Sequence, residues 1–187
     1  MQEMPEECRT ERLANQRFRG EIPSVVEALA ATCKSRNCFD HVNAEPIPSR
    51  EAVLAILRRI GDILFPGYFV QTRLDGLNVG YYLGQEVTAL FEALSEQVAL
   101  AIRHDCRRHD LACLNCTERG LEAAFEFLRA LPGMREALAQ DVRAAYEGDP
   151  AARDHDEVIF SYPGRYAVMV HRIAHRLRTL DVPLITR

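Results

Sequence analysis

Apolar residues recur three and four positions apart along two long stretches of this chain. The first stretch runs from Ser49 to Leu64, and the second runs from about Val79 to Arg108. Apolar residues at this spacing line one face of an α-helix, so both stretches are predicted to be amphipathic helices. In the second stretch the apolar stripe consists of Leu83, Val87, Leu90, Leu94, Val98 and Ile102.

Residues with special backbone preferences mark the ends of the first helix. Ser49 is a favourable N-cap, and Glu51 follows in the first turn, where the helix dipole favours an acid. Phe65-Pro66-Gly67 is predicted to end the helix, because proline removes a hydrogen-bond donor and glycine tolerates a turn. The connector from Tyr68 to Asn78 shows no clear pattern.

The carboxy-terminal half is predicted to contain several shorter helices. Thr117 can cap a helix that Pro132-Gly133 breaks, and a second helix over 135–146 is predicted to end at Gly148. Asp149 followed by Pro150 resembles a new helix start, with an acceptor at the N-cap and proline at the first helical position. The remaining marks are Asp156, which could cap a short turn, Pro163-Gly164 before a last helix, and Pro183, which stops it.

The amino-terminal region has a different character. Residues 1–20 are charged and are predicted to form a mobile or loosely docked arm, with a short helix starting near Pro23 and a loop from Cys33 to Pro48. We therefore divide the chain into an arm with a short helix over 1–48 and a helical domain over 49–187. No segment alternates with period two, so the predicted fold class is all-α, a multi-helix bundle.

Composition narrows the function classes. The 187 residues include 48% hydrophobic residues, with 23 Lys and Arg against 27 Asp and Glu, a net charge of −4. This balance and the scattered basic residues argue against nucleic acid as a partner. No apolar run approaches the roughly 18 to 20 residues of a membrane span. The acidic amino terminus lacks the apolar core of a secretory signal, so a cytoplasmic protein without a membrane partner is expected.

Three of the six cysteines lie close to a histidine within one short segment: Cys106, His109, Cys113 and Cys116. Zinc prefers four such ligands, and Cys-x-x-Cys supplies two from one turn. Free thiols and a disulfide under oxidising conditions are the alternatives, and free thiols are favoured in a reducing compartment. The pair Cys33 and Cys38 is a weaker signal. We assign no metal ligand here.

His171 and His175 lie four positions apart, on one face of the last predicted helix. Two histidines at this spacing occur in His-Glu-x-x-His metal sites, but Arg172 stands where the glutamate belongs. A cation beside a metal ion is unfavourable, so this pair is not predicted to be a metal site. Glycine-rich nucleotide loops and a Gly-x-Ser-x-Gly elbow are also absent from the sequence.

Several short motifs together resemble the amino-terminal helical domain of serine acetyltransferases, in a longer-headed bacterial branch. The strongest is Asp141-Val-Arg-Ala-Ala-Tyr-Glu-Gly-Asp149-Pro-Ala-Ala152. The others are Leu64-Phe-Pro-Gly-Tyr-Phe69, Val98-Ala-Leu-Ala-Ile-Arg-His-Asp-Cys106, Leu131-Pro-Gly-Met-Arg135, Tyr162-Pro-Gly164, His171 to His175 and Val182-Pro-Leu-Ile185. The first 48 residues carry much less of the resemblance.

The resemblance implies a role for Asp149. On sequence alone its carboxylate is best interpreted as a helix cap, whereas the family's matching aspartate contacts the substrate serine and the inhibitor cysteine. An aspartate suits that contact because it offers a negative charge and two acceptors to an ammonium group. Asp149 is therefore the one predicted substrate-binding residue. Arg172, Ile173 and His175 match an element that the resemblance assigns to packing.

The resemblance also implies what this chain does not carry. In the family a left-handed β-helix of hexapeptide repeats holds the catalytic histidines, which transfer acetyl from acetyl-CoA to serine by general-base catalysis. We therefore predict no catalytic residue and no cofactor in this chain, with acetyl-CoA a co-substrate of the complete enzyme. The expected partners are further copies, as a trimer or dimer of trimers, and O-acetylserine sulfhydrylase. The alternative is a stand-alone helical interaction or metal-binding regulatory module.

Overall fold

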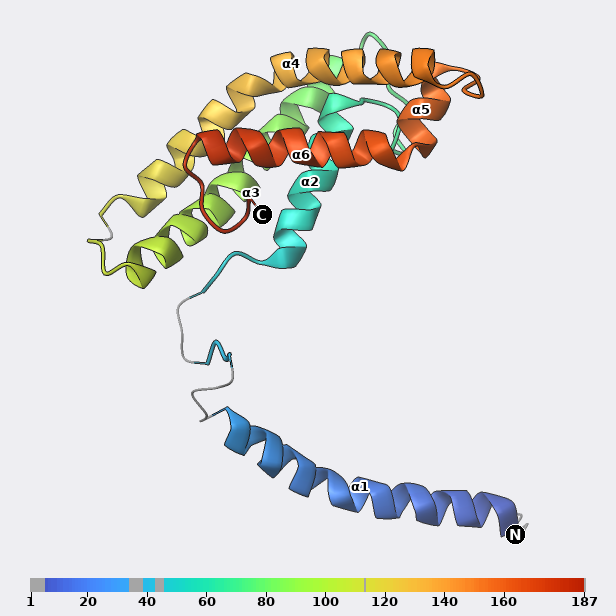
Figure 1. Cartoon of the computed structure of the whole chain (residues 1–187), viewed down its shortest axis with the longest axis vertical. Coiled ribbons are helices and arrows are strands. Elements are labelled where there is room, and N and C mark those ends of the chain that lie inside the picture. Colours follow the sequence, from blue (N-terminus) through green and yellow to red (C-terminus); the bar gives the residue numbers. More distant parts are fainter. Residues whose placement is uncertain (1–5, 34–38, 43–45, 113, 187) are drawn as a thin grey trace. The chain divides into compact units, whose positions relative to one another are not determined.

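The structure is a computed structural model that describes residues 6–33, 39–42, 46–112 and 114–186, with backbone alone for residues 6–13. Within these ranges it contains six helices and no strand (Figure 1), which confirms the predicted all-α class. The helices are α1 (Glu6–Thr32), α2 (Arg50–Leu64), α3 (Val79–Arg108), α4 (Cys116–Gly148), α5 (His155–Ser161) and α6 (Pro163–Thr179). The chain divides into two compact units, Met1–Ala44 and Glu45–Arg187.

Among its described residues the first unit contains one helix, α1, which is longer than the short helix expected from the sequence. α1 passes through Pro23 without interruption. Proline removes one backbone hydrogen bond, but good helix formers such as Gln16 and Arg17 precede it and keep their own bonds. The apolar side chains of Phe18 and Leu29 are exposed. The predicted helix start near Pro23 is therefore wrong, because the helix already begins at Glu6.

The predicted boundaries of α2 are confirmed. The hydroxyl of Ser49 accepts a hydrogen bond from the Ala52 amide at 3.3 Å, and the helix ends at Leu64 before Phe65. The backbone amide of Ser49 in turn donates to Oε1 of the buried Gln97 side chain on α3, at 2.8 Å. A side chain of α3 thus holds the first turn of α2, and the two helices pack against each other.

α3 and α4 form a helical hairpin whose contact is the most extensive in the second unit. Gly120 on α4 lies directly against the backbone of α3. A Cβ atom at position 120 would lie 2.8 Å from the carbonyl oxygen of Ser95 and 2.9 Å from the Cβ of Ala99. The fully buried side chains that form the core between the helices include Ile60, Leu64, Leu90, Leu94, Val98, Phe127, Leu138, Val158, Met169 and Ile173.

α4 is one continuous helix, so the predicted break at Pro132-Gly133 is wrong. Leu131 and Met134 are buried on either side of the proline, whereas Pro132 and Gly133 themselves are exposed. Continuing the helix keeps both buried residues on its inner face, and the exposed side accommodates the lost hydrogen bond. The ribbon bends along its length but does not separate (Figure 1), as expected for a helix with an interior proline.

The starts of two helices also differ from the prediction. α4 begins at Cys116 after Asn115, whose left-handed backbone (φ 60°) turns the chain, so Thr117 is not the cap. α5 is capped by Asp154, whose carboxylate accepts the Glu157 amide at 2.7 Å, rather than by Asp156. Asn115 makes no side-chain capping hydrogen bond, whereas Asp154 caps α5 with the same chemistry that Asp156 offers, so the sequence could not distinguish these two aspartates.

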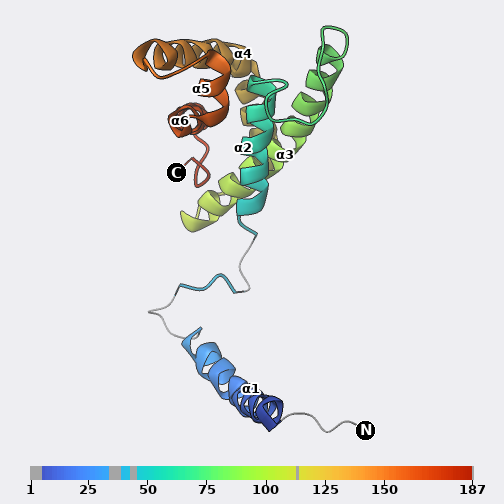
Figure 2. The same cartoon turned by 90° about the vertical axis from the view of Figure 1, so that its right-hand side faces the viewer.

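α6 begins at Pro163, close to the predicted start, and buries Met169, Ile173 and Leu177 against the other helices. Figure 2 shows α5 and α6 together on one side of the α2–α3 pair. No helix in the described ranges has both the length and the apolar content needed to cross a bilayer.

Candidate functional site

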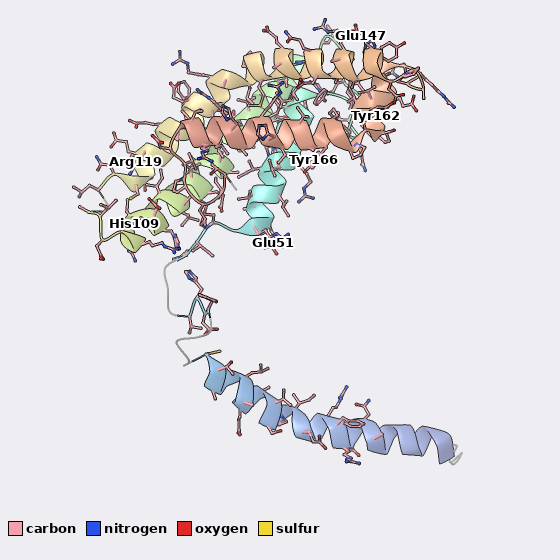
Figure 3. The ribbon with its side chains drawn as sticks, in the orientation of Figure 1. Glu51, His109, Arg119, Glu147, Tyr162 and Tyr166 are labelled. Carbon is pink, nitrogen blue, oxygen red and sulfur yellow. The ribbon has the colours of Figure 1, made fainter. Side chains whose placement is uncertain are left out.

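Asp149 lies where α4 ends, opposite the junction between α5 and α6. Its Oδ2 accepts a hydrogen bond from the hydroxyl of Tyr162 at 2.5 Å, and its Oδ1 accepts one from the amide of Ala151 at 2.9 Å. Tyr162 is the residue that joins α5 to α6 (Figure 3). The carboxylate is therefore oriented by its own turn and by a side chain thirteen residues away.

The predicted helix start at Asp149 is wrong. Asp149 follows the last residue of α4, and the chain then makes a single turn, closed by a 3.0 Å hydrogen bond from the amide of Ala152 to the carbonyl of Asp149. The carboxylate caps this turn instead of a helix, because aspartate accepts from the amide two residues later in such turns. α5 begins only at His155.

The hydrogen bond to Tyr162 changes the proton affinity of both partners. It lowers the pKa of Asp149 below 3.8, with a further contribution from the Ala151 amide, because both donors stabilise the charged form. The same hydrogen bond raises the pKa of Tyr162 to about 12. At neutral pH this corner of the molecule thus presents an ionised carboxylate and a protonated phenol.

The charge of Asp149 is not neutralised within the described part of the chain, where no Lys, Arg or His nitrogen lies within ion-pair distance of it. Each of its oxygens has one hydrogen-bond donor, and a carboxylate oxygen can accept a second. Asp149 is half-buried. It can therefore receive a cationic group from outside the chain.

Asp141, the first aspartate of the same motif, has a different role. Its carboxylate accepts two hydrogen bonds from Arg172 on α6, Nε to Oδ2 at 2.8 Å and Nη2 to Oδ1 at 2.7 Å. This hydrogen bond raises the pKa of Arg172. The bidentate pair joins α4 to α6, just as Tyr162 joins the start of α6 to the end of α4. Asp141 therefore positions the helices that carry the Asp149 corner.

His171 and His175 are exposed on α6, with their rings 6.3 Å apart and nearly parallel. Ile173, between them in sequence, faces the core. Within the described residues no group of three or more His, Cys, Asp or Glu side chains is arranged to hold a metal ion. The hydrogen bonds of the Asp149 side chain go to Ala151 and Tyr162, and neither histidine is among its described partners.

The cysteine segment is described only in part, since Cys113 and Cys38 lie outside the described residues. Cys106 is a buried free thiol, and Cys33 is an exposed one. Cys116 is buried and disulfide-bonded, so Cys106 and Cys116 are not joined to each other. His109 is exposed and lies 3.6 Å from Asp105 on the preceding turn of α3.

Comparison with known proteins relates this geometry to a family. No protein-family model matches the chain. It is 36% identical over 145 residues to the plasmid serine acetyltransferase of Synechococcus elongatus, covering 76% of this chain and 46% of that protein. The chain is a homologue of the serine acetyltransferases. It is also 48% identical over 54 residues to the serine acetyltransferase of Synechocystis sp., which is 29% of this chain and 22% of that one.

Solved serine acetyltransferase structures share the fold. Serine acetyltransferase 1 of Entamoeba histolytica, crystallised with L-cysteine, superposes with a TM-score of 0.56 at 24% identity, over 84% of this chain and 52% of that one. Isoform 3 from the same organism, with cysteine, gives a TM-score of 0.56 at 23% identity, over 85% of this chain and 50% of that one. The chain thus spans about half the length of the serine acetyltransferases it matches.

The sequence indicated Asp149 but missed the two contacts that place it. Tyr162 and Arg172 both stand in motifs of the serine acetyltransferase resemblance, yet neither could be paired from the sequence. Tyr162 lies 13 residues from its partner and Arg172 lies 31 residues from its own. A tyrosine directly before a helix-initiating proline was the available signal for Tyr162, and it does not specify a partner.

Proposed function

We propose that this chain is the helical domain of a serine O-acetyltransferase, in which Asp149 binds the ammonium group of serine. The observation that carries the proposal is the ionised, half-buried Asp149 carboxylate, which Tyr162 and the Ala151 amide orient and which no described cation neutralises. A charge-assisted hydrogen bond from an ammonium group is the contact that such a carboxylate favours.

In the complete enzyme the chemistry would be a transfer of acetyl from the thioester of acetyl-CoA to the hydroxyl oxygen of serine. The serine oxygen forms a bond to the acetyl carbon, the carbon–sulfur bond breaks, and the hydroxyl proton passes through a general base to the departing thiolate. The general base belongs to the hexapeptide-repeat domain of the family. We therefore infer that this chain binds and orients serine but is inactive alone, as part of a cytoplasmic biosynthetic enzyme.

A test of inactivity uses the pure 187-residue chain. Incubation with serine and acetyl-CoA is expected to release no CoA thiol above the rate without protein. Release of thiol together with formation of O-acetylserine would show that the chain carries its own catalytic groups and would overturn this part of the proposal.

A test of Asp149 uses a chimera in which residues 1–187 precede the remainder of the Synechococcus elongatus relative. Asp149→Asn is expected to raise the KM for serine about tenfold or more, because a charge-assisted hydrogen bond is lost. The KM for acetyl-CoA is expected to stay unchanged. Glu147→Gln is the matched control, since Glu147 is an exposed carboxylate two residues away, and it should leave both constants unchanged. An unchanged KM for serine in Asp149→Asn would show that Asp149 caps its turn and does not bind serine.

The proposal also includes self-association, as a trimer or dimer of trimers, with O-acetylserine sulfhydrylase as a further partner. Tyr166 of α6 is 45% exposed and could belong to an interface, whereas Met169 on the same helix is 1% exposed and belongs to the core. Light scattering on the chimera tests the oligomer, and co-purification with the sulfhydrylase tests the partner. The alternative, a stand-alone helical interaction or metal-binding regulatory module, would be favoured by bound zinc in elemental analysis.

A further inference from the structure

Arg165 lies in a cavity between α2 and α6. The cavity has a volume of about 320 Å³ and lies between Leu57 and Asp62 of α2, Phe69 of the following connector, and Arg165 and Met169 of α6. A second cation, the exposed Arg58, also borders it and donates from Nε to the Leu54 carbonyl of its own helix. Tyr166, which borders the same cavity, is labelled on α6 in Figure 3. This size falls at the lower end of the range for small-molecule sites, and an apolar lining with few polar groups is typical of them.

The guanidinium of Arg165 is poorly satisfied. Its central carbon lies 5.0 Å from the ring centre of Phe65 and 5.1 Å from that of Phe69. Nε is buried and has no hydrogen-bond acceptor among the described residues, and Nη1 lies 3.8 Å from the weakly accepting sulfur of Met169. A guanidinium has five N–H donors, and the one on Nε is buried without an acceptor from the described protein.

No carboxylate of the described chain neutralises Arg165. Asp62 borders the same cavity, but the charges that act on it are those of Glu86 and Arg59, and no ion pair joins it to Arg165. Burial lowers the pKa of Arg165 below its ordinary value; the phenol of Tyr166 opposes this effect in part, and no carboxylate contributes. An unpaired cation in an apolar site is costly.

The position of Arg165 in its helix increases the local positive potential. It is the third residue of α6, whose first turn contains no acid and whose N-terminus has no side-chain cap. A helix N-terminus carries a partial positive charge, so a cation there is unfavourable and an anion favourable. A bound anion would accept a hydrogen bond from the buried Nε, pair with the guanidinium and interact favourably with the helix N-terminus.

We propose that this cavity binds a small monoanion with an apolar body, such as an arylacetate or a branched aliphatic carboxylate. The carboxylate pairs with Arg165, and the apolar part lies against Leu57, Phe69 and Met169. The two aromatic rings contact the guanidinium without supplying an acceptor for its N–H groups, and the cavity is too small for a folded partner. The proposal is independent of the role assigned to Asp149.

The test is an NMR titration of the 187-residue chain, followed through the methyl signal of Met169. Phenylacetate is expected to cause a saturable shift of this signal. Phenylacetamide, which keeps the shape and lacks the charge, and acetate, which keeps the charge and lacks the ring, are each expected to bind about tenfold more weakly or worse. Equal affinity for phenylacetate and phenylacetamide, or no saturable shift with phenylacetate, would overturn the proposal.

Variants separate charge from packing. Arg165→Met keeps the apolar length and is expected to abolish the preference for phenylacetate over phenylacetamide. Arg165→Lys is expected to retain part of it, and Asp62→Asn is expected to tighten phenylacetate binding, because an acid beside the cavity is removed. Arg178→Met, at an exposed arginine in the last turn of α6, is the control and should change nothing. A preference that survives in Arg165→Met would contradict the proposal, and Arg165→Lys keeps it testable should Arg165→Met fail to fold.

Discussion

Arg172 on α6 donates two hydrogen bonds to the carboxylate of Asp141 on α4, and this bidentate pair joins the two helices that present Asp149 and Tyr162. The pair is the only bidentate salt bridge among the described residues. Its two side chains are 38% and 29% exposed, so solvent screens their attraction. Geometry rather than burial makes the contact specific.

Removal of either partner should destabilise the helical unit modestly. Asp141→Asn and Arg172→Met are each expected to lower the free energy of unfolding by about 1 kcal/mol, because the pair is partly exposed. The double variant is expected to lose less than the sum of the two. A double-mutant cycle in chemical denaturation measures this coupling. A coupling energy of zero would show that the two charges act independently.

We predict that loss of the hydrogen bond between Asp149 and Tyr162 changes the pKa of Asp149. Tyr162→Phe is expected to raise the pKa of Asp149 toward 3.8, because the largest stabilising donor is lost. Carboxyl-carbon NMR against pH measures this change. Tyr166→Phe, at an exposed tyrosine on the same helix, is the control and should leave the pKa of Asp149 unchanged, whereas an equal shift in both variants would contradict a specific contact.

The same contact sets a pH dependence of stability. The folded-state pKa of Asp149 lies below its ordinary 3.8, so its contribution is present above that pH and is lost as the pH falls through the lower value. The folded-state pKa of Tyr162 is about 12, above the ordinary 10.0, so its contribution is present below pH 10 and is lost as the pH rises through 12. In thermal melting against pH, Tyr162→Phe should lack the alkaline loss and show a smaller acidic loss than the parent chain, because the Ala151 amide still stabilises the Asp149 carboxylate.

Replacing either of two glycines in α4 with alanine should change the free energy of unfolding, in opposite directions for the two positions. Gly120→Ala places a Cβ at 2.8 Å from the Ser95 carbonyl and is expected to destabilise by about 1 to 3 kcal/mol through overpacking. Gly133→Ala meets nothing within 4 Å and is expected to stabilise by up to about 1 kcal/mol, because alanine favours the helix. Chemical denaturation distinguishes them, and destabilisation by both would show that helix propensity does not decide the result at Gly133.

We predict that Gln97 stabilises the fold through its hydrogen bond with the Ser49 amide. Gln97→Met removes the acceptor of the Ser49 amide and is expected to cost about 0.5 to 1.5 kcal/mol, since one hydrogen bond is lost at an exposed residue. Hydrogen exchange at the Ser49 amide should accelerate. Gln85→Met, at an exposed glutamine on the same helix, should change stability by less than about 0.5 kcal/mol. An unchanged exchange rate in Gln97→Met would show that another interaction protects the Ser49 amide.

The helices that the sequence predicted best are those with a strong apolar stripe and strong end signals. The bounds of α3 and the Ser49 cap of α2 follow from local pattern, because both depend on residues within a few positions of each other. Pro132 shows the limit of that approach. Its local preference favours a break, but buried Leu131 and Met134 make a continuous α4 more favourable.

At the candidate site, too, some features could be predicted from the sequence and others could not. Asp149 was identified from its motif, but its interpretation as a helix cap was wrong because the chain forms a turn there and α5 starts later. Tyr162 and Arg172 acquire their roles only when α6 packs beside α4. The unsatisfied guanidinium of Arg165 could not be seen in the sequence, because burial and the absence of a nearby acid are properties of the packed chain.

By itself the sequence determined the all-α class, most helix ends and the candidate carboxylate, since helical periodicity and capping act over a single turn of chain. Only the tertiary structure decided which charged groups are paired, which are buried alone and which glycine contacts a neighbouring helix. These properties depend on distances between residues that are remote in sequence, and packing of the helices sets those distances.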